Sequence, residues 1–568
     1  MPKSIARQLR TTARRTFGWE SLRAEQTAAM TAVMEGRDTL VVMPTGAGKS
    51  AVYQVPGVLL DGPTVVVSPL IALQRDQVEG LLGLDGPAAA AVNSTQRAAE
   101  NRAAWDRVTT GDIDFLFLAP EQLARDEVVD QLAEAKPALV VVDEAQCVSS
   151  WGHDFRPDYL RIRHALGRIG RPPVLALTAN AAAPVRADIV EQLGMADVHE
   201  VVAGFDRPNI SLEVTTFQDE EVKRRAVVER AAAEAKPGIV YAATRRDAEA
   251  YAADLAELGL DSAPYHAGMR AADRTDVHDR FRDGSLDVVV ATSAFGMGID
   301  KADIRFVLHA SVPGSLDAFY QEMGRAGRDG EPARAILAYR PQDLGLQRFL
   351  SSGRPDPDTL VQVLRLLRRR RKPVSLTELR EESGLSASRL TAVVNLLEHS
   401  DAVRTNEDGT AEAVPRVKEE EVVRDAMRLG DSRQQLEQSR VEMMRGFAET
   451  TSCRRQFLLG YFGERPDEPC GNCDVCASAE LRLDGADEHG DTVLAGTGSA
   501  PAAPAAAPDH PFAPGTRVTH AAWGEGETMS EEDGKLTVLF DSVGYRTLSV
   551  AAVVKGDILK PASEDAAA

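Results

Sequence analysis

One turn of this 568-residue chain has the residues that hold nucleotide phosphates in proteins. Residues 43–50 read MPTGAGKS, and they follow an apolar run and precede a helical pattern. In such a turn, backbone N–H groups and a helix N-terminus surround the phosphate oxygens. The residues expected to contact the nucleotide here are Thr45, Gly46, Gly48, Lys49 and Ser50. Lys49 should hold the β- and γ-phosphates and Ser50 should ligate Mg²⁺, whereas an ordinary glycine turn is the alternative.

An acidic pair at the end of a second apolar run supplies the carboxylates that phosphoryl transfer needs. Asp143 and Glu144 follow residues 139–142, which have the pattern of a buried strand. In such sites one carboxylate binds Mg²⁺ through water and another orients the attacking water. We therefore expect Asp143 to bind the metal and Glu144 to act as general base. Two carboxylates that cap a strand are the alternative.

Two arginines in residues 321–328, which read QEMGRAGR, could reach a γ-phosphate from another domain. We expect Gln321, Arg325 and Arg328 to be catalytic, with Arg328 as the finger that stabilises charge in the transition state. Such a split site is complete only when the two domains close. A cluster of surface ion pairs is the alternative. In this order along the chain, the three stretches predict an ATP-driven nucleic-acid motor.

The hydrophobic pattern predicts the elements that must position these residues. Short Val/Leu-rich runs alternate with helical stretches from about residue 38 to 205, the pattern of a buried parallel sheet with crossover helices. The pattern starts again after residue 209, so we predict two tandem α/β domains, 1–205 and 206–350. The expected strands are residues 39–42, 64–67, 115–118, 139–142, 174–177, 238–241, 287–290 and 306–309.

The rest of the chain divides into smaller parts by composition. The predicted units are a winged-helix-like domain at 355–415, a helical zinc-binding segment at 416–478, an Ala/Pro/Gly/Asp-rich linker at 479–510 and a small SH3/Tudor-like β-domain at 511–560.

Composition limits the class of protein. The formal net charge is −21, so contacts with nucleic acid must come from local patches such as the basic run at 368–372. The sequence has no run of about 18 apolar residues and no apolar core near its start, so we expect no membrane contact and a cytoplasmic, nucleoid-associated location.

Four of the five cysteines are bunched near the end of the helical region. Cys453, Cys470, Cys473 and Cys476 have the spacing C-x16-C-x2-C-x2-C. Four thiolates suit tetrahedral Zn²⁺ in a closed structural site. Cys147 stands alone and is expected to be a small buried residue.

The chain resembles the RecQ family of superfamily 2 DNA helicases over roughly residues 10–345 and again at 450–478. The resemblance implies an α/β fold with two RecA-like domains, and ATP-dependent unwinding with 3′-to-5′ travel in DNA repair and recombination. The segments that carry it are residues 17–19, 22–26, 68–71, 119–122, 150–157, 177–179, 294–301, 320–328 and 453–463.

The resemblance also implies where the adenine and the DNA strand bind. Trp19, Arg23 and Gln26 match the segment that recognises adenine, with Trp19 stacked on the base and Gln26 bonded to its edge. A capping aromatic residue in a core is the alternative for Trp19.

Residues 150–157, SWGHDFRP, match the family's aromatic-rich loop. The expected DNA-binding residues are Trp151, His153, Phe155 and Arg156. The aromatic rings can stack on unpaired bases, so DNA would be sensed beside the hydrolytic site. Aromatic rings buried in a core are the alternative.

Three positions depart from the family pattern. Met43 replaces the first glycine of the phosphate loop, Gln146 stands where His is usual, and Asn180 stands where a small hydroxyl residue is usual. Gln146 and Asn180 lie where hydrolysis couples to movement. We expect ATP hydrolysis to survive, because the lysine, the acidic pair and the arginines are all present.

The accessory parts have their own expected partners. The winged-helix-like unit precedes the zinc segment, whereas it normally follows it in the family, and either DNA contact or a structural role is open. The β-domain resembles the Tudor-like tail of UvrD-type helicases, which implies docking of a protein such as RNA polymerase or a repair protein. The expected ligands are ATP, Mg²⁺, Zn²⁺ and single-stranded and forked DNA. An RNA helicase and an ATP-switched scaffold are the alternatives.

Overall fold

A computed structural model describes most of the chain. The described residues are 2–69, 71–84, 86–93, 96–149, 159, 161–295, 301–345, 356–370, 372–400, 402–405, 410–415, 418–478, 511–512, 516–521, 523–532, 535–540, 544–556 and 558–561.

The first domain is built on a seven-stranded parallel sheet with the order β3-β4-β2-β5-β6-β1-β7. Its strands are β1 (Thr39–Val42), β2 (Thr64–Val67), β3 (Ala89–Val92), β4 (Phe115–Leu118), β5 (Leu139–Val142), β6 (Val174–Thr178) and β7 (His199–Val202). Its helices are α1 (Pro2–Phe17), α2 (Ala24–Met34), α3 (Ala51–Gly57), α4 (Ile71–Leu82), α5 (Ala98–Thr110), α6 (Asp126–Ala135), α7 (Arg161–Arg168) and α8 (Ala183–Gln192). Two 3₁₀ turns, η1 (Pro120–Ala124) and η2 (Ala145–Val148), follow β4 and β5.

The central strands are apolar on both faces because helices cover both sides of the sheet. Alternate residues of one strand belong to different cores: Val65 and Val67 pack in one cluster, and Val66 packs in the other. This double burial is the physical basis of the short Val/Leu-rich runs in the sequence.

The second domain has a six-stranded parallel sheet with the order β10-β11-β9-β12-β13-β8. Its strands are β8 (Ile210–Thr216), β9 (Gly238–Tyr241), β10 (Ser262–Tyr265), β11 (Val288–Ala291), β12 (Phe306–His309) and β13 (Ala333–Tyr339). Its helices are α9 (Glu220–Ala233), α10 (Arg245–Glu257), α11 (Ala271–Asp283) and α12 (Leu316–Met323). The predicted fold class, two tandem α/β domains with parallel sheets, is confirmed.

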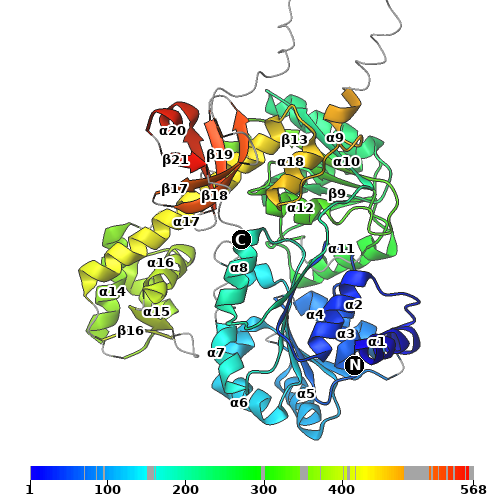
Figure 1. The fold of residues 1–568 in the computed structure, drawn as a ribbon, viewed down its shortest axis with the longest axis vertical. Helices are drawn as coiled ribbons and strands as arrows, with labels where there is room; N and C mark the ends of the chain where they lie inside the picture. The colour runs from blue at the N-terminus through cyan, green and yellow to red at the C-terminus, as the bar shows by residue number, and fades with distance from the viewer. Residues whose placement is uncertain are drawn as a thin grey trace, which may run out of the picture.

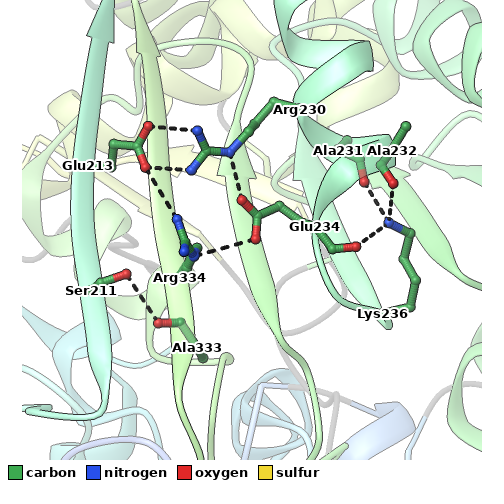
Figure 2. Close-up of polar contacts among 9 residues, drawn as sticks. All are labelled: Ser211, Glu213, Arg230, Ala231, Ala232, Glu234, Lys236, Ala333 and Arg334. Atoms are coloured by element: carbon green, nitrogen blue, oxygen red, sulfur yellow. Dashed lines mark hydrogen bonds and ion pairs between the residues drawn. The ribbon is translucent and has the colours of Figure 1, made fainter. Parts of the chain in front are cut away.

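An ion-pair network joins helix α9 to the β8 edge of this sheet (Figure 2). Arg230 on α9 pairs with Glu213 on β8 at 2.5 Å and with Glu234 at 2.6 Å. Arg334 on the neighbouring strand β13 contacts the same two carboxylates at 3.8 and 3.6 Å. Lys236 donates to carbonyls at the end of α9, including that of Ala231 at 2.7 Å. The four-residue network therefore fixes one end of the helix on two strands.

The winged-helix-like unit lies to one side of the two motor domains (Figure 1). Its elements are α14 (Pro357–Arg370), β14 (Val374–Ser375), α15 (Leu376–Ser383), α16 (Ala387–His399), β15 (Val403–Thr405) and β16 (Thr410–Ala413). The three strands form an antiparallel sheet with the order β14-β16-β15.

Two arginines of the basic run, both on α14, lie beside carboxylates. Arg368 lies 4.0 Å from Glu419, and Arg370 pairs with Glu382. Arg365, one turn earlier, pairs with Glu419 at 2.6 Å. These pairs would compete with DNA phosphates for the same guanidinium groups.

Helix α17 (Glu419–Glu449) connects this unit to the motor domains (Figure 1). Val422 near its start packs in the winged-helix core, whereas Phe447 near its end packs in the core of the second domain. Helix α18 (Arg454–Tyr461) follows, and the first cysteine of the cluster, Cys453, is its N-cap.

The C-terminal part is a five-stranded antiparallel sheet with the order β20-β19-β18-β17-β21. The elements are β17 (Arg517–His520), β18 (Gly524–Glu532), β19 (Lys535–Phe540), β20 (Gly544–Ser549), α20 (Val550–Gly556) and β21 (Leu559–Pro561). Strand β20 lies against α17. Among the described helices, none combines the length and the apolar character that a membrane span requires.

Candidate ATP-hydrolysis and zinc sites

The phosphate loop lies between β1 and α3, at the carboxyl end of a strand inside the sheet. Gly46 and Gly48 have φ angles of +82° and +77°, a conformation that residues with a side chain rarely adopt. Helix α3 begins at Ala51, with Ser50 as its N-cap. The loop therefore presents a helix N-terminus to a bound anion.

Lys49 lies at the base of this loop. Its Nζ donates to the carbonyl of Met43 at 3.1 Å. Burial lowers the pKa of the Lys49 ammonium, while the carboxylates of Glu144 and Asp143 oppose that shift. A lysine beside two carboxylates in a phosphate-loop turn suits a phosphate-binding role.

The acidic pair follows β5, beside the phosphate loop. Burial, together with the Glu144 carboxylate, raises the pKa of Asp143 to about 7, and Lys49 opposes this shift. Asp143 accepts from the backbone N–H of Glu144 at 3.0 Å, and Ser68 Oγ lies 3.5 Å from its other oxygen. The hydroxyl of Tyr159 donates to the Asp143 carbonyl at 3.1 Å. The metal-binding candidate is thus held rigidly.

Glu144 has φ +49° and ψ +49°, the left-handed region that is unfavourable for a residue with a side chain. This conformation costs about 1–2 kcal/mol. Strain of this kind persists where surrounding contacts hold a functional side chain in place. The Gln146 Nε2 atom supplies one such contact, donating to Glu144 Oε2 at 2.8 Å.

The arginine segment of the second domain reaches the phosphate loop. A Cβ atom built on Gly46 would lie 3.2 Å from Cγ of Arg328, so the Arg328 side chain lies directly over the loop. Arg325 is buried inside the second domain, where its charge acts on the hydroxyl of Tyr241. Gln321 is half-buried in the last turn of α12. Of the three predicted side chains, Arg328 therefore has the position expected of a finger.

Arg207, in the linker between the two domains, makes contacts that the sequence did not predict. Its Nη1 donates to the carbonyls of Thr45 and Gly324 at 3.2 and 3.1 Å. Its Nη2 donates to the carbonyls of Ala326 and Gly327 at 2.9 and 3.1 Å. Burial lowers the pKa of this guanidinium. Arg207 thus ties the phosphate loop to the segment that carries Arg328, and backbone acceptors leave no signal in a sequence.

The three adenine-recognition candidates lie at and just before the start of α2, and one of them contacts the phosphate loop. Trp19 is half-buried and stacks on Phe17, with ring centroids 4.6 Å apart. Gln26 donates to the carbonyl of Gly48 at 3.1 Å and accepts from the backbone N–H of Arg23 at 2.9 Å. The Arg23 side chain is exposed. Gln26 therefore braces the phosphate loop in addition to any contact with a base.

The predicted DNA-binding residues lie outside the described part of the chain. They are Trp151, His153, Phe155 and Arg156, and residues 296–300 of the second-domain motif are outside it as well.

The four clustered cysteines form a candidate zinc site. Their Sγ atoms all lie within 4.8 Å of one another. Tetrahedral Zn²⁺ with bonds of about 2.3 Å separates sulfurs by about 3.8 Å, so the donor set fits the ion. Backbone N–H groups of Cys470 and Asn472 donate to sulfurs of Cys453 and Cys470, each at 3.3 Å. The cysteines are Cys453, Cys470, Cys473 and Cys476.

The thiols of this cluster differ in acidity. Burial opposes ionisation of Cys453, but the N–H groups of Cys470 and Gln456 lower its pKa to about 7. Burial raises the pKa of Cys476 to about 12. Zinc binding would therefore displace protons from the cluster.

The zinc segment contacts the linker between the two motor domains. Phe462 stacks on Phe205, with ring centroids 4.6 Å apart and an angle of 13° between the rings. Glu464 accepts from the backbone N–H of Phe205 at 2.7 Å. Arg455 pairs with Asp206 at 2.6 Å. The zinc segment therefore helps to set the relative position of the two domains.

Comparison with known proteins places the chain in a family. Residues 23–187 match the DEAD/DEAH box helicase family, residues 222–330 the helicase conserved C-terminal domain, and residues 417–477 the RecQ zinc-binding family. The chain is 34% identical over 469 residues to the probable ATP-dependent DNA helicase RecS of Bacillus subtilis (strain 168), covering 82% of this chain and 91% of that protein. It is also 34% identical over 472 residues to the ATP-dependent DNA helicase RecQ of Haemophilus influenzae, covering 83% of this chain.

The chain spans 63% of the length of the Haemophilus RecQ protein. Among solved structures, it is similar to the DUF1998 helicase MrfA bound to DNA, with a TM-score of 0.50, 18% identity, and coverage of 74% of this chain and 60% of that one. That similarity concerns the fold alone. The helicase domains, the zinc-binding segment and the identity to RecS agree, and the chain belongs to the RecQ family of superfamily 2 helicases.

Proposed function

We propose that this chain is an ATP-dependent DNA helicase of the RecQ type, which hydrolyses ATP between its two motor domains and travels 3′ to 5′ on single-stranded DNA in repair and recombination. The observation that carries the proposal is the position of Arg328, which reaches from the second domain to Gly46 in the phosphate loop of the first. A site assembled from two domains can convert hydrolysis into relative movement.

The residues of the first domain have separate roles in this proposal. Lys49 contacts the β- and γ-phosphates, and the loop backbone at Thr45, Gly46 and Gly48 surrounds them. Ser50 and Asp143 hold Mg²⁺, which neutralises phosphate charge when bound. Glu144 orients the attacking water.

The second domain and the adenine segment complete the site. Arg328 stabilises the charge that develops in the transition state, and Gln321 and Arg325 support the segment that presents it. Trp19, Arg23 and Gln26 recognise the base of the nucleotide. The last role of Gln26 would use the second lone pair of its Oε1, because its amide nitrogen donates to the carbonyls of Ala47 and Gly48 and Oε1 accepts one bond from Arg23.

The proposed substrates are single-stranded and forked DNA. Trp151, Phe155, His153 and Arg156 form the proposed strand-binding loop, which precedes Tyr159 and hence the contact with Asp143. The winged-helix-like unit is a second candidate for DNA contact.

The C-terminal β-domain is the proposed docking site for a protein partner, either RNA polymerase or a repair protein. His520 stacks on Trp523, with centroids 3.9 Å apart, and Arg546 lies 5.7 Å from the same Trp523 ring. The acidic sequence at residues 531–533 disfavours DNA as its direct ligand.

Two assays test the proposed function. ATP hydrolysis is measured with and without single-stranded DNA, and strand displacement is measured on duplexes with a 3′ or a 5′ overhang, with Lys49→Ala as the inactive control. DNA-stimulated hydrolysis with displacement from the 3′ overhang supports the helicase. Hydrolysis without displacement would replace it with a translocase or a switch, and hydrolysis unaffected by DNA would overturn the proposal.

A further inference from the structure

A row of residues, linked by hydrogen bonds through side chains and backbone and buried except at Glu144, runs from the candidate general base to the zinc segment. We call this row the polar relay, and its members are Glu144, Gln146, Thr178, Asn180, Asp317 and Tyr461. We propose that Asn180 and Tyr461 are positioning residues, which make the orientation of the Glu144 carboxylate depend on how the second domain and the zinc segment are docked. This inference rests on the proposed ATP-hydrolysing function.

The first part of the relay fixes the carboxylate within the first domain. Gln146 donates from Nε2 to Glu144 at 2.8 Å, and its Oε1 accepts from the hydroxyl of Thr178 at 2.6 Å. The Gln146 and Thr178 side chains are each 1% exposed, so little water can replace these bonds. Because the Glu144 carboxylate can only accept hydrogen bonds, it fixes the Nε2 end of the Gln146 amide toward itself, and Oε1 is left to accept from the Thr178 hydroxyl.

The Thr178 hydroxyl has a choice of acceptor. Its oxygen lies 2.6 Å from Gln146 Oε1 and 2.8 Å from the carbonyl oxygen of Asn180. A hydroxyl has one hydrogen to donate, so the two acceptors compete for it. The position of Asn180 therefore decides whether Gln146, and through it Glu144, stays anchored.

The second part of the relay links Asn180 to the other two units. Asn180 Nδ2 donates to the carbonyl of Asp317 at 3.0 Å, in the first turn of α12 of the second domain. The carboxylate of Asp317 accepts from the hydroxyl of Tyr461 on α18. Asn180, Asp317 and Tyr461 are all buried. One helix turn of the second domain is thus held from both sides.

Asn180 donates to Asp317, but another polar atom of the same side chain has no hydrogen-bond donor in the described part of the chain. Asn180 Oδ1 is buried, and no donor among the described residues satisfies it. An unsatisfied buried acceptor destabilises the docked arrangement, and its cost offsets the stabilisation that the bond to Asp317 contributes. The bond is therefore suited to break and form as the second domain moves.

Helix α12 connects the relay to the segment that carries Arg328. It begins at Leu316, beside the relay, and its C-terminal end leads directly into the segment that carries Arg328. A displacement of α12 would therefore shift the finger and loosen the general base together. The relay makes hydrolysis depend on complete docking of the second domain.

A double-mutant cycle tests the relay. The steady-state kcat and KM for ATP, with saturating single-stranded DNA, are measured for wild type, Asn180→Ala, Tyr461→Phe and the double variant. Loss of one hydrogen bond in the relay should lower kcat roughly fivefold, with KM little changed, because neither residue contacts the proposed nucleotide site. The double variant should lose no more than the stronger single variant, since both changes break the same row of contacts.

Two further variants separate positioning from general loosening. Tyr339→Phe removes another buried hydroxyl, one that bonds Glu449 on α17 and joins the second domain to the same accessory region outside the relay, and it should keep the wild-type kcat. Thr178→Val should lose kcat and Thr178→Ser should restore it, because serine keeps the hydroxyl.

Additive losses in the double variant, or an equal loss in Tyr339→Phe, would overturn the relay while leaving the proposed function intact. Wild-type kcat in both single variants would do the same. A wild-type chain that does not hydrolyse ATP would overturn the proposed function, and the relay with it.

Discussion

Arg207 offers a demanding test of how the two motor domains are held together. Its guanidinium donates to four backbone carbonyls, one in the phosphate loop at Thr45 and three in the second domain between Gly324 and Gly327. In Arg207→Lys a single ammonium keeps the charge but cannot span both groups of acceptors. The variant therefore separates the geometry of the fork from its charge.

The magnitude follows from the bonds that are lost. If lysine keeps two of the four contacts, the closed arrangement loses on the order of 2 kcal/mol, which is about a 30-fold change in the closed population. We expect the kcat for DNA-stimulated ATP hydrolysis to fall by up to about that factor. Steady-state kinetics at saturating ATP, combined with equilibrium binding of a fluorescent ATP analogue, measure the effect.

A matched control is Arg224→Lys, an arginine of the second domain that pairs with Asp254 at 2.6 Å, away from the phosphate loop. It should keep the wild-type kcat. A wild-type kcat in Arg207→Lys, or an equal loss of activity in both lysine variants, would show that the Arg207 fork does not hold the two domains in the closed arrangement.

The remaining predictions concern the phosphate loop, the candidate zinc site and the proposed strand-binding loop. Gly46→Ala should abolish ATP hydrolysis, because the φ of Gly46 is +82° and the added Cβ would lie 3.2 Å from the side chain of Arg328. Gly18 has a similar φ of +71° but open space around it, so Gly18→Ala should lose far less activity. Cys473→Ser should reduce bound zinc from about one ion per chain and lower the melting temperature, as measured by metal analysis and thermal unfolding, while Cys147→Ser should keep its zinc. Trp151→Ala should lose the stimulation of ATP hydrolysis by single-stranded DNA, and normal unwinding by this variant would contradict the proposed coupling.

The sequence predicted the central strands because each is buried on both faces. The four strands at the sheet edges, β3, β7, β8 and β10, were not predicted. In β7 the burial alternates with exposure, and β3 is Ala-Ala-Ala-Val, so neither has the continuous run of large apolar residues that marks an interior strand. β13, next to the β8 edge, was missed too.

In the candidate site, too, some features could be predicted from the sequence and others could not. The phosphate loop and the acidic pair are local in sequence, because one strand and one turn position each of them. The contacts of Arg207 are with backbone carbonyls, which every residue has, so no pattern could indicate them. Gln146 and Asn180 stood out as departures from the family, but only the fold shows that one contacts Glu144 and the other Asp317.

The central claim is that the second domain completes the ATP site through Arg328. Its most direct test is the rate of ATP hydrolysis by Arg328→Ala with saturating single-stranded DNA, alongside ATP binding by the same variant. We expect kcat to fall by about 10³-fold or more while ATP binding is retained, because the arginine acts on transition-state charge. A kcat close to that of the wild type would contradict it.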